Sequence, residues 1–234
     1  MLSSVDRNRI YLLGAAGLGA VIVAVVLIIV GTGGGSSGTT TNSGALVLPT
    51  PSLKGIPQNG DILGKPSAPV TVQVFEDPQC PYCREWNVDT LPSVLANYIK
   101  TGKIKLQYRG IEIISANSVD GLRAIYAGAQ QNKLWQMVDA LYARQGEENS
   151  GWITPGLIKA AATAEGADPA KIASAESSAA VDTMLKDSSD AAKAAAIGGT
   201  PSFVVQRPPA LPTQLQLAGL DPASFAAALD PILK

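Results

Sequence analysis

The sequence predicts an α/β fold in which one β-sheet carries helices on both faces, receives an all-helical insertion and follows one N-terminal transmembrane helix. Three observations lead to this prediction. Runs with the β-branched content or the alternation typical of strands lie near residues 72, 105 and 204, helical periodicity fills the stretch between the second and third runs, and an uncharged apolar run lies near the N-terminus. Strands that are separated by helices favour a single sheet with helices on its faces.

Composition excludes several classes of function. The chain of 234 residues has a net charge of −1 and no basic run, which argues against a nucleic-acid partner. It contains no histidine, so histidine-based acid–base catalysis and zinc sites that need imidazole are excluded. Its only two cysteines would need carboxylates to complete a zinc site, and we therefore expect no bound metal.

The N-terminal part is predicted to cross a membrane. Residues 10–30 form an uncharged apolar run of 21 residues, which at ~1.5 Å per residue matches the ~30 Å hydrocarbon core of a bilayer. Arg7 and Arg9 precede this run, and the first charge after it is Lys54. The positive-inside rule therefore places residues 1–9 in the cytoplasm and the rest of the chain on the extracytoplasmic side, periplasmic or facing the cell wall.

Two further features describe this anchor. The apolar run exceeds the ~7–15 residues of a signal-peptide core, which favours an uncleaved anchor over a cleaved signal peptide. Residues 31–58 are rich in Gly, Ser, Thr and Pro and show no apolar periodicity. They are predicted to be a flexible linker.

The folded domain is predicted to span residues 59–234. Residues 69–75 form the first predicted strand, residues 81–100 a helix and residues 103–108 a second strand, because apolar residues recur first with strand and then with helix spacing. Pro92 lies inside this helix and predicts a kink, since proline removes a backbone hydrogen bond.

Residues 115–197 are predicted to be a block of helices inserted between the second and third strands. Thr154 and Asp168 each precede a proline, which is typical of a helix N-cap. Gly166 and Gly198 are predicted to end helices.

The C-terminal part completes the predicted sheet. Residues 202–206 and 214–217 are the predicted third and fourth strands, joined by a proline-rich turn. Asp221 is predicted to cap a final amphipathic helix, because Pro222 follows it.

The two cysteines, Cys80 and Cys83, lie where the first strand meets the helix. Unpaired N–H groups and the helix dipole stabilise an anion at that end, so the thiolate of Cys80 is favoured. Pro81 suits the first helical turn. A redox couple, half of a metal site and a structural staple are the alternatives. A disulfide across so short a loop would stabilise the fold little, and redox exchange is therefore the favoured chemistry.

A second motif gives the pattern a family resemblance. The run Phe75-x-Asp77-x-x-Cys80-Pro81-Tyr82-Cys83 is followed about 120 residues later by Gly199-Thr200-Pro201-Ser202-Phe203. Together these runs resemble the DsbA-like thiol:disulfide oxidoreductases of the thioredoxin superfamily, and more closely the membrane-anchored, BdbD-type members. The resemblance covers roughly residues 60–234.

This resemblance implies a thioredoxin fold and assigns roles to particular residues. Cys80 and Cys83 would be the catalytic couple, with Pro81 and Tyr82 as the active-site dipeptide between them. Pro201 would follow a cis peptide bond beside the cysteines, and the backbone of Thr200 would pair with an extended substrate. The active-site dipeptide departs from the Pro-His of the best-known oxidases, which removes one positive charge near the thiolate.

The resemblance also implies a function. It favours an anchored oxidase, needing no cofactor, that forms disulfides in reduced exported proteins and is reoxidised by a membrane partner of the DsbB or vitamin-K-epoxide-reductase type. A reductase or isomerase of the same fold is an alternative, because Tyr82 and Thr200 occur in isomerase-type members. The third alternative is a binding or chaperone-like module with a passive disulfide.

One part of the family pattern is displaced. Thioredoxin relatives carry a buried acid six residues before the first cysteine, where this sequence has Val74. Glu76 and Asp77 lie nearer to Cys80 and are candidates for proton transfer from Cys83. The sequence alone favours the other interpretation, in which both are solvated loop charges.

Overall fold

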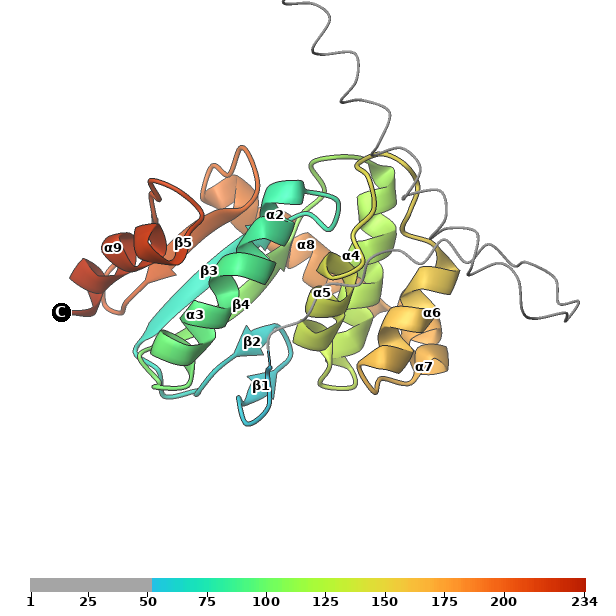
Figure 1. The fold of residues 1–234 in the computed structure, drawn as a ribbon, viewed down its shortest axis with the longest axis horizontal. Helices are drawn as coiled ribbons and strands as arrows, with labels where there is room; N and C mark the ends of the chain where they lie inside the picture. The colour runs from blue at the N-terminus through green and yellow to red at the C-terminus, as the bar shows by residue number, and fades with distance from the viewer. Residues whose placement is uncertain (1–51) are drawn as a thin grey trace, which may run out of the picture. The chain divides into compact units, whose positions relative to one another are not determined.

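A computed structural model describes residues 52–234, so the predicted membrane segment and most of the predicted linker lie outside the described residues. Within residues 52–234, no helix is both long and apolar enough to cross a membrane. The described chain contains a six-stranded sheet in the order β1-β2-β4-β3-β5-β6, and Figure 1 shows its arrangement. Its strands are β1 (Gln58–Asn59), β2 (Ile62–Leu63), β3 (Val70–Glu76), β4 (Ile104–Gly110), β5 (Ser202–Gln206) and β6 (Thr213–Gln214).

The centre of the sheet is the pair β3 and β4, which run parallel, with β5 antiparallel on the other side of β3. The first three predicted strands are confirmed to within two residues. The predicted fourth strand is mostly wrong, because pairing in β6 ends at Gln214. One further backbone bond follows, from the Leu215 N–H to the Phe203 carbonyl at 2.8 Å. Leu215 is buried and its neighbours Gln214 and Gln216 are exposed, so the alternation in residues 214–217 mainly reflects burial on one side.

The start of the domain also differs from the prediction. Leu53 and Ile56 are buried in the main hydrophobic core, although they belong to the predicted linker. Residues 58–59 and 62–63 then form the two short strands β1 and β2, which were not predicted. These strands are too short to show a period of two, and the two isolated apolar residues carry no periodic signal.

One continuous helical run follows β3. It consists of α2 (Pro81–Glu85), the π-helical turn η1 (Trp86–Thr90), α3 (Leu91–Val94) and the π-helical turn η2 (Leu95–Ile99). The extent of the predicted helix, residues 81–100, is confirmed. The interruption expected near Pro92 takes the form of the two π-helical turns, which are wider than the turns of an α-helix. The Leu91 N–H donates to the Trp86 carbonyl five residues earlier, just before Pro92, which has no N–H to give.

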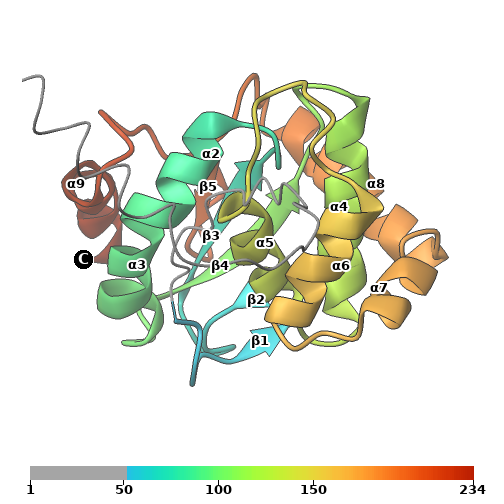
Figure 2. The same cartoon turned by 45° about the vertical axis from the view of Figure 1, so that its right-hand side comes forward.

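The predicted helical insertion is confirmed. It comprises α4 (Ala116–Ala129), α5 (Leu134–Tyr142), α6 (Pro155–Ala164), α7 (Pro169–Ala175) and α8 (Ala179–Ala194). Figure 2 shows α4 to α7 gathered beside the sheet. The side chains of Thr154 and Asp168 accept hydrogen bonds from the first turns of α6 and α7, as predicted for N-caps.

Of the two glycines that were predicted to end helices, only one does so. Gly166 follows α6 with a φ of +68°, in the left-handed region that glycine favours. The prediction for Gly198 is wrong, because α8 ends earlier and Ala196 takes the left-handed conformation with a φ of +52°. The last helix is α9 (Pro222–Leu233), and the Asp221 side chain caps it as predicted.

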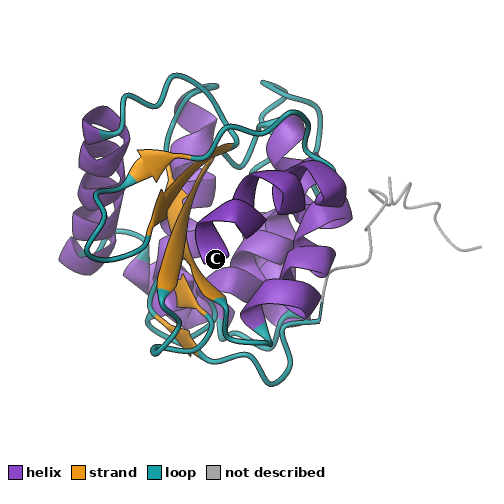
Figure 3. Ribbon diagram, turned by 90° about the vertical axis from the view of Figure 1, so that its left-hand side faces the viewer, coloured by secondary structure: helices purple, strands orange, loops and turns teal. Residues whose placement is uncertain are grey.

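Helices cover both faces of the sheet (Figure 3). On one face, Trp86 packs against Phe203 and Phe225 with ring centroids 4.6 and 4.9 Å apart, which joins the helical run after β3 to β5 and α9. On the other face, Ala192 of α8 packs with Phe75 and Val204. Buried aromatic rings contribute a large part of such a core, so the helix that carries the cysteines is firmly seated.

Candidate active site

Cys80 occupies the junction that the sequence predicted. It is the N-cap residue of α2, with φ −72° and ψ 119°, and Pro81 takes the first helical position. Cys80 is 4% exposed and Cys83, one turn further on, is fully buried. Both are free thiols, so the structure represents the reduced form. Pro81 and Tyr82 face outward between them, and the Tyr82 side chain is largely exposed.

The second motif lies beside the first. The Thr200–Pro201 peptide bond is cis, as the resemblance implied. The Cys80 thiol donates a hydrogen bond to the Thr200 carbonyl oxygen at 3.2 Å, although 120 residues separate them in sequence. The pairing of β3 with β5, in which Phe75 lies opposite Ser202, brings the two motifs together. A hollow of about 270 Å³ opens next to Pro201, lined by residues 201–203, 214–217, 219 and 220.

Neutral hydrogen-bond donors lower the pKa of Cys80. Its pKa falls from the ordinary 9.0 to about 6, first because of the side-chain hydrogen bond with Cys83 and against the opposing effect of burial. The side chain of Thr200 and the backbone N–H groups of Tyr82 and Cys83 add to the effect. These contacts stabilise the thiolate without the charged partner whose absence was noted in the sequence.

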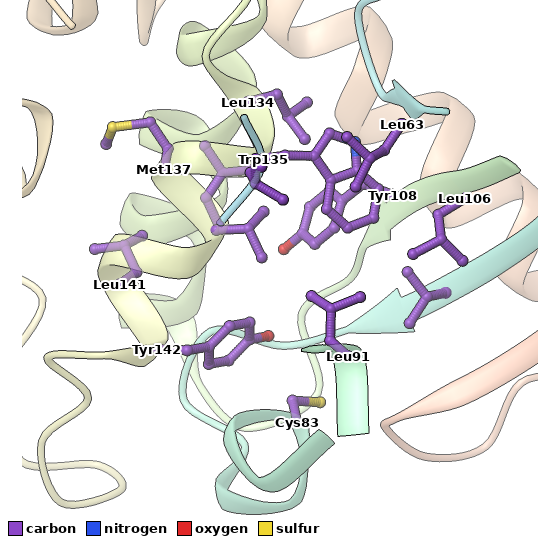
Figure 4. Packing of buried hydrophobic residues seen from close by; sticks show 14 of the residues in the cluster. Leu63, Cys83, Leu91, Leu106, Tyr108, Leu134, Trp135, Met137, Leu141 and Tyr142 are labelled. Atoms are coloured by element: carbon purple, nitrogen blue, oxygen red, sulfur yellow. The ribbon is translucent and has the colours of Figure 1, made fainter. Parts of the chain in front are cut away.

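Cys83 has the opposite character. Burial raises its pKa well above 9.0, and its contact with Cys80 and the nearby Glu76 carboxylate raise it further. Figure 4 shows the Cys83 sulfur and the hydroxyl groups of Tyr108 and Tyr142 turned toward the same part of the interior. At neutral pH the site therefore holds one thiolate at the start of α2 and one protonated thiol deeper in the interior.

The interpretation of Glu76 as a solvated loop charge is wrong. Glu76 is fully buried, because it continues the inward-facing set Val70, Val72 and Val74 of β3. Its Oε1 atom accepts a hydrogen bond from Asn87 Nδ2 at 2.8 Å. Burial raises the pKa of Glu76 to about 8, and favourable contacts with Asn87 and Tyr142 offset this only in part. A carboxyl that titrates near neutral pH can exchange a proton at the site.

Asp77 is also buried, so its interpretation as a solvated charge is wrong as well. Its two carboxylate oxygens accept hydrogen bonds from four donors at 2.7–2.9 Å: Gln79 N, Ser118 Oγ, Ile113 N and Ile114 N. These bonds fasten the loop before Cys80 to the segment between β4 and α4. The geometry thus distinguishes the two acids, since Asp77 is occupied in holding the backbone and Glu76 lies next to Asn87 beneath the cysteines.

Three side chains near the site were not anticipated. Asn87 could have been noticed, because it follows Cys83 by four residues and so shares its helix face. Gln145 donates to the carbonyl oxygens of Pro78 and Cys80 at 2.8 and 3.0 Å. Gln79 donates to Ser115 and Ser118 at 2.7 and 3.0 Å. No local pattern marks Gln79 or Gln145, since their importance depends on how the insertion docks.

Comparison with known proteins fits this geometry. A family model described as thioredoxin matches residues 58–208, which is more than half of the chain. The chain belongs to the thioredoxin family. Both predicted motifs, the cysteine pair and the cis-proline, fall inside the matched thioredoxin region.

Two relatives within the family carry names that state a role. The chain is 38% identical over 98 residues to the "Probable disulfide bond formation protein D" of Bacillus cereus, a match that covers 41% of this chain and 45% of the relative. It is 30% identical over 112 residues to the "Disulfide bond formation protein D" of Bacillus subtilis, covering 46% and 48%. The chain thus spans about half the length of the curated relatives that it matches.

Solved structures show the same thioredoxin fold with an insertion. Oxidised BdbD from Bacillus subtilis matches with a TM-score of 0.65 at 23% identity, covering 80% of this chain and 98% of that one. A thioredoxin-like oxidoreductase from Silicibacter pomeroyi matches with a TM-score of 0.59 at 26% identity, covering 76% and 91%. The expected DsbA-like fold is therefore confirmed.

Proposed function

We propose that this protein is a thiol:disulfide oxidase that forms disulfides in exported proteins through Cys80 and Cys83. The observation that carries the proposal is the asymmetry of the pair, in which the outer thiol has its pKa lowered to about 6 and the inner thiol has its pKa raised. The names of the Bacillus relatives support the same role.

The oxidase cycle follows from thiol–disulfide exchange. With Cys80 and Cys83 joined as a disulfide, a substrate thiolate attacks the Cys80 sulfur, the bond between the cysteines breaks, and Cys83 leaves as a thiolate that takes up a proton. A second substrate thiolate then attacks the substrate sulfur of the mixed disulfide. Cys80 leaves as the stabilised thiolate, two electrons have passed to the protein, and the substrate carries a new disulfide.

The low pKa of Cys80 favours this direction. A thiolate that is stable at neutral pH stabilises the reduced protein, which makes its disulfide a stronger oxidant. In this proposal the Thr200 backbone pairs with an extended substrate segment, and the hollow next to Pro201 receives one of its side chains. Pro81 and Tyr82 form the outer surface that the substrate meets.

The location of the oxidase is part of the proposal. Residues 10–30 anchor the chain in the cell membrane, with residues 1–9 in the cytoplasm and the catalytic domain on the extracytoplasmic side. Disulfides form and persist in proteins that are exported to that side of the membrane. Each cycle ends with Cys80 and Cys83 reduced, so a membrane partner of the DsbB or vitamin-K-epoxide-reductase type reoxidises them.

The reduction potential of the full-length protein tests the direction of electron flow. It is measured by equilibration with glutathione buffers, and an oxidase is expected to be clearly more oxidising than the roughly −270 mV of thioredoxin. A potential at or below that value would contradict the oxidase and favour a reductase.

Two variants test the chemistry itself. In Cys83→Ser the Cys80 thiolate should attack a disulfide of an oxidised substrate protein and remain joined to it as a mixed disulfide, because the resolving thiol is absent. Cys80→Ser should abolish both this capture and substrate oxidation. If Cys80→Ser kept both, the redox assignment would be wrong and the passive-disulfide alternative would stand.

A further inference from the structure

The side-chain amide of Asn87 joins the buried acid to the buried cysteine. Asn87 Nδ2 donates to Glu76 Oε1 at 2.8 Å and to the Cys83 carbonyl oxygen at 2.8 Å. An amide NH₂ group has two hydrogens, so both bonds can form at once. Asn87 is 2% exposed and Glu76 is fully buried, so bulk water does not compete for these donors. The amide thus fixes the position of the Glu76 carboxyl relative to Cys83.

The local helix geometry places Asn87 at an irregular point. Asn87 is the second residue of the π-helical turn η1, which begins directly after α2. The Trp86 N–H donates to the carbonyls of Tyr82 and Cys83, and the Asn87 side chain adds a further donor to the Cys83 carbonyl. Single π-helical turns are frequent at functional sites, because the wider turn redirects a side chain.

The groups around Glu76 make this donor important. Cys80 and Cys83 lie on α2, Tyr108 on β4, and Tyr142 and Asp139 on α5, while Asp77 is adjacent in sequence. None of these groups is a cation, so among the described residues that face Glu76 the ionised carboxylate relies on neutral donors. Asn87 is the strongest influence that lowers the Glu76 pKa against the effect of burial.

We propose that Asn87 is a positioning residue that holds Glu76 beside Cys83 as the ionised base for proton transfer in thiol–disulfide exchange. This inference rests on the proposed function. When Cys83 resolves a mixed disulfide, its proton passes to the Glu76 carboxylate and the new Cys83 thiolate attacks the Cys80 sulfur. In the oxidase this step belongs to reoxidation: the bond between Cys80 and the sulfur of the reoxidising membrane partner breaks, and the partner leaves as a thiolate. The charge of the buried pair stays at −1 during the proton transfer, so no second buried charge has to form.

The first test titrates Glu76 itself. In reduced full-length protein labelled with ¹³C at glutamate carboxyl groups, the Glu76 resonance is identified by its loss in Glu76→Gln and followed by NMR. Asn87→Leu, which keeps the branched shape and the number of heavy atoms but has no donor, should raise the titration midpoint from about 8 by about one further pH unit. An unchanged midpoint would overturn the inference. Should Asn87→Leu fail to fold, Asn87→Ala carries the same test.

A matched control on the same helical run separates this effect from general loosening. The Thr90 hydroxyl is buried and donates to the Leu220 carbonyl, away from Glu76. Thr90→Val removes that hydrogen bond and should leave the Glu76 midpoint where it is. A shift of equal size in Thr90→Val would show that Asn87 acts only through helix stability.

The second test measures the proton-transfer step. The mixed disulfide of Cys80 with glutathione is prepared, and its release by Cys83 is followed by stopped flow against pH. Asn87→Leu should slow release about tenfold at pH 7 and approach the parent rate at pH values above both Glu76 midpoints. In a Glu76→Gln background Asn87→Leu should have no further effect on release. A tenfold effect that persists in that background would refute the inference.

These outcomes are distinguishable from a failure of the proposed function. The carboxyl titration uses no redox step, so it reports on Asn87 whatever direction the electrons take. A reductase-like potential combined with a shifted Glu76 midpoint would reject the oxidase and keep the positioning role.

Discussion

Among the individual residues, Cys80 owes its reactivity to neutral donors and not to a charged neighbour. The largest contribution is the hydrogen bond with Cys83. The two sulfurs therefore depend on each other, since the Cys83 thiol stabilises the Cys80 thiolate. This dependence can be tested with a pair of variants.

Cys83→Ala should raise the pKa of Cys80 above about 6, because the donor is lost. Cys83→Ser keeps a donor at the same position and should leave the pKa closer to the parent value. Thiolate absorbance near 240 nm, followed against pH, measures both. Equal midpoints in the two variants would mean that the Cys83 hydrogen bond is not the main cause.

Glu76→Gln should stabilise the reduced protein at neutral pH. The folded-state pKa of Glu76 is raised from 4.5 to about 8, so its contribution to stability is fully present below pH 4.5 and is lost as the pH rises toward 8. Gln cannot ionise and avoids this loss, which corresponds to roughly 3 kcal/mol at pH 7. Urea unfolding at pH 4 and pH 7 measures the effect. The two proteins should differ little at pH 4, and a difference that did not grow with pH would contradict the assignment.

The roles of single residues could be predicted from sequence only where a local pattern exists. The cysteine pair was found because it lies at a predicted helix start, and Thr200–Pro201 was found only through the family resemblance. Glu76 was misjudged, although strand alternation from Val70 through Val74 extends to it and predicts burial. That interpretation gave more weight to the charge of Glu76 than to its place in the alternating pattern of the strand. Burial of an ionisable group at a functional site is the case in which a composition rule fails.

Within the secondary-structure elements, β4 approaches α4 closely at Gly110, near the site. Gly110 ends β4, lies opposite Glu76 in the ladder and donates its N–H to the Tyr126 hydroxyl at 2.7 Å. A Cβ atom at Gly110 would lie 2.4 Å from Leu122 Cδ2 and 2.9 Å from Tyr108 Cε1. Both neighbours are buried and cannot move aside freely, so this contact requires glycine.

Gly110→Ala should therefore destabilise the protein by about 1–3 kcal/mol through overpacking. Gly156→Ala is the matched control, since Gly156 is exposed and its added Cβ would meet only Thr154 Oγ1 at 3.8 Å. The control should be neutral or slightly stabilising, because alanine is the better helix former. Thermal or urea unfolding compares the two, and equal effects would show that β4 and α4 can separate without cost.

The elements that sequence predicted well are long or capped. The insertion helices, β3 to β5 and the caps at Thr154, Asp168 and Asp221 are confirmed, because periodicity and cap chemistry act over a few residues. The short strands β1, β2 and β6 were missed or misplaced. They exist because a neighbouring strand is already in place, and that partner is remote in sequence.

In the whole molecule, Asp77 connects the thioredoxin sheet to the helical insertion. It joins the active-site loop to Ile113 and Ile114 after β4 and to Ser118 on α4. Gln145 adds a second connection from the loop after α5 to the Cys80 carbonyl. The insertion therefore supports the reactive cysteine directly. The insertion could be predicted from the sequence but these connections could not, because they arise only once the two parts pack.

Asp77→Ala should destabilise the protein by about 3 kcal/mol or more, because it leaves several partly buried donors without an acceptor. Asp187→Ala on α8 is the control, since Asp187 is exposed and a surface change there should stay within about 0.5 kcal/mol. Urea unfolding measures the loss. Hydrogen exchange should also accelerate at the Ile113 and Ile114 amides, and unchanged protection there would contradict the connecting role.

The way in which the Cys80 thiolate is stabilised has a consequence for the medium in which the protein works. Dissolved ions screen interactions between charges at a surface, with a Debye length of about 8 Å at physiological ionic strength. The causes that lower the Cys80 pKa are short hydrogen bonds from thiol, side-chain and backbone groups, and none is an ion pair. Salt has little to screen in such a site. The Cys80 pKa should therefore change little between dilute buffer and concentrated salt, so that a fluctuating salt concentration would leave the thiolate intact.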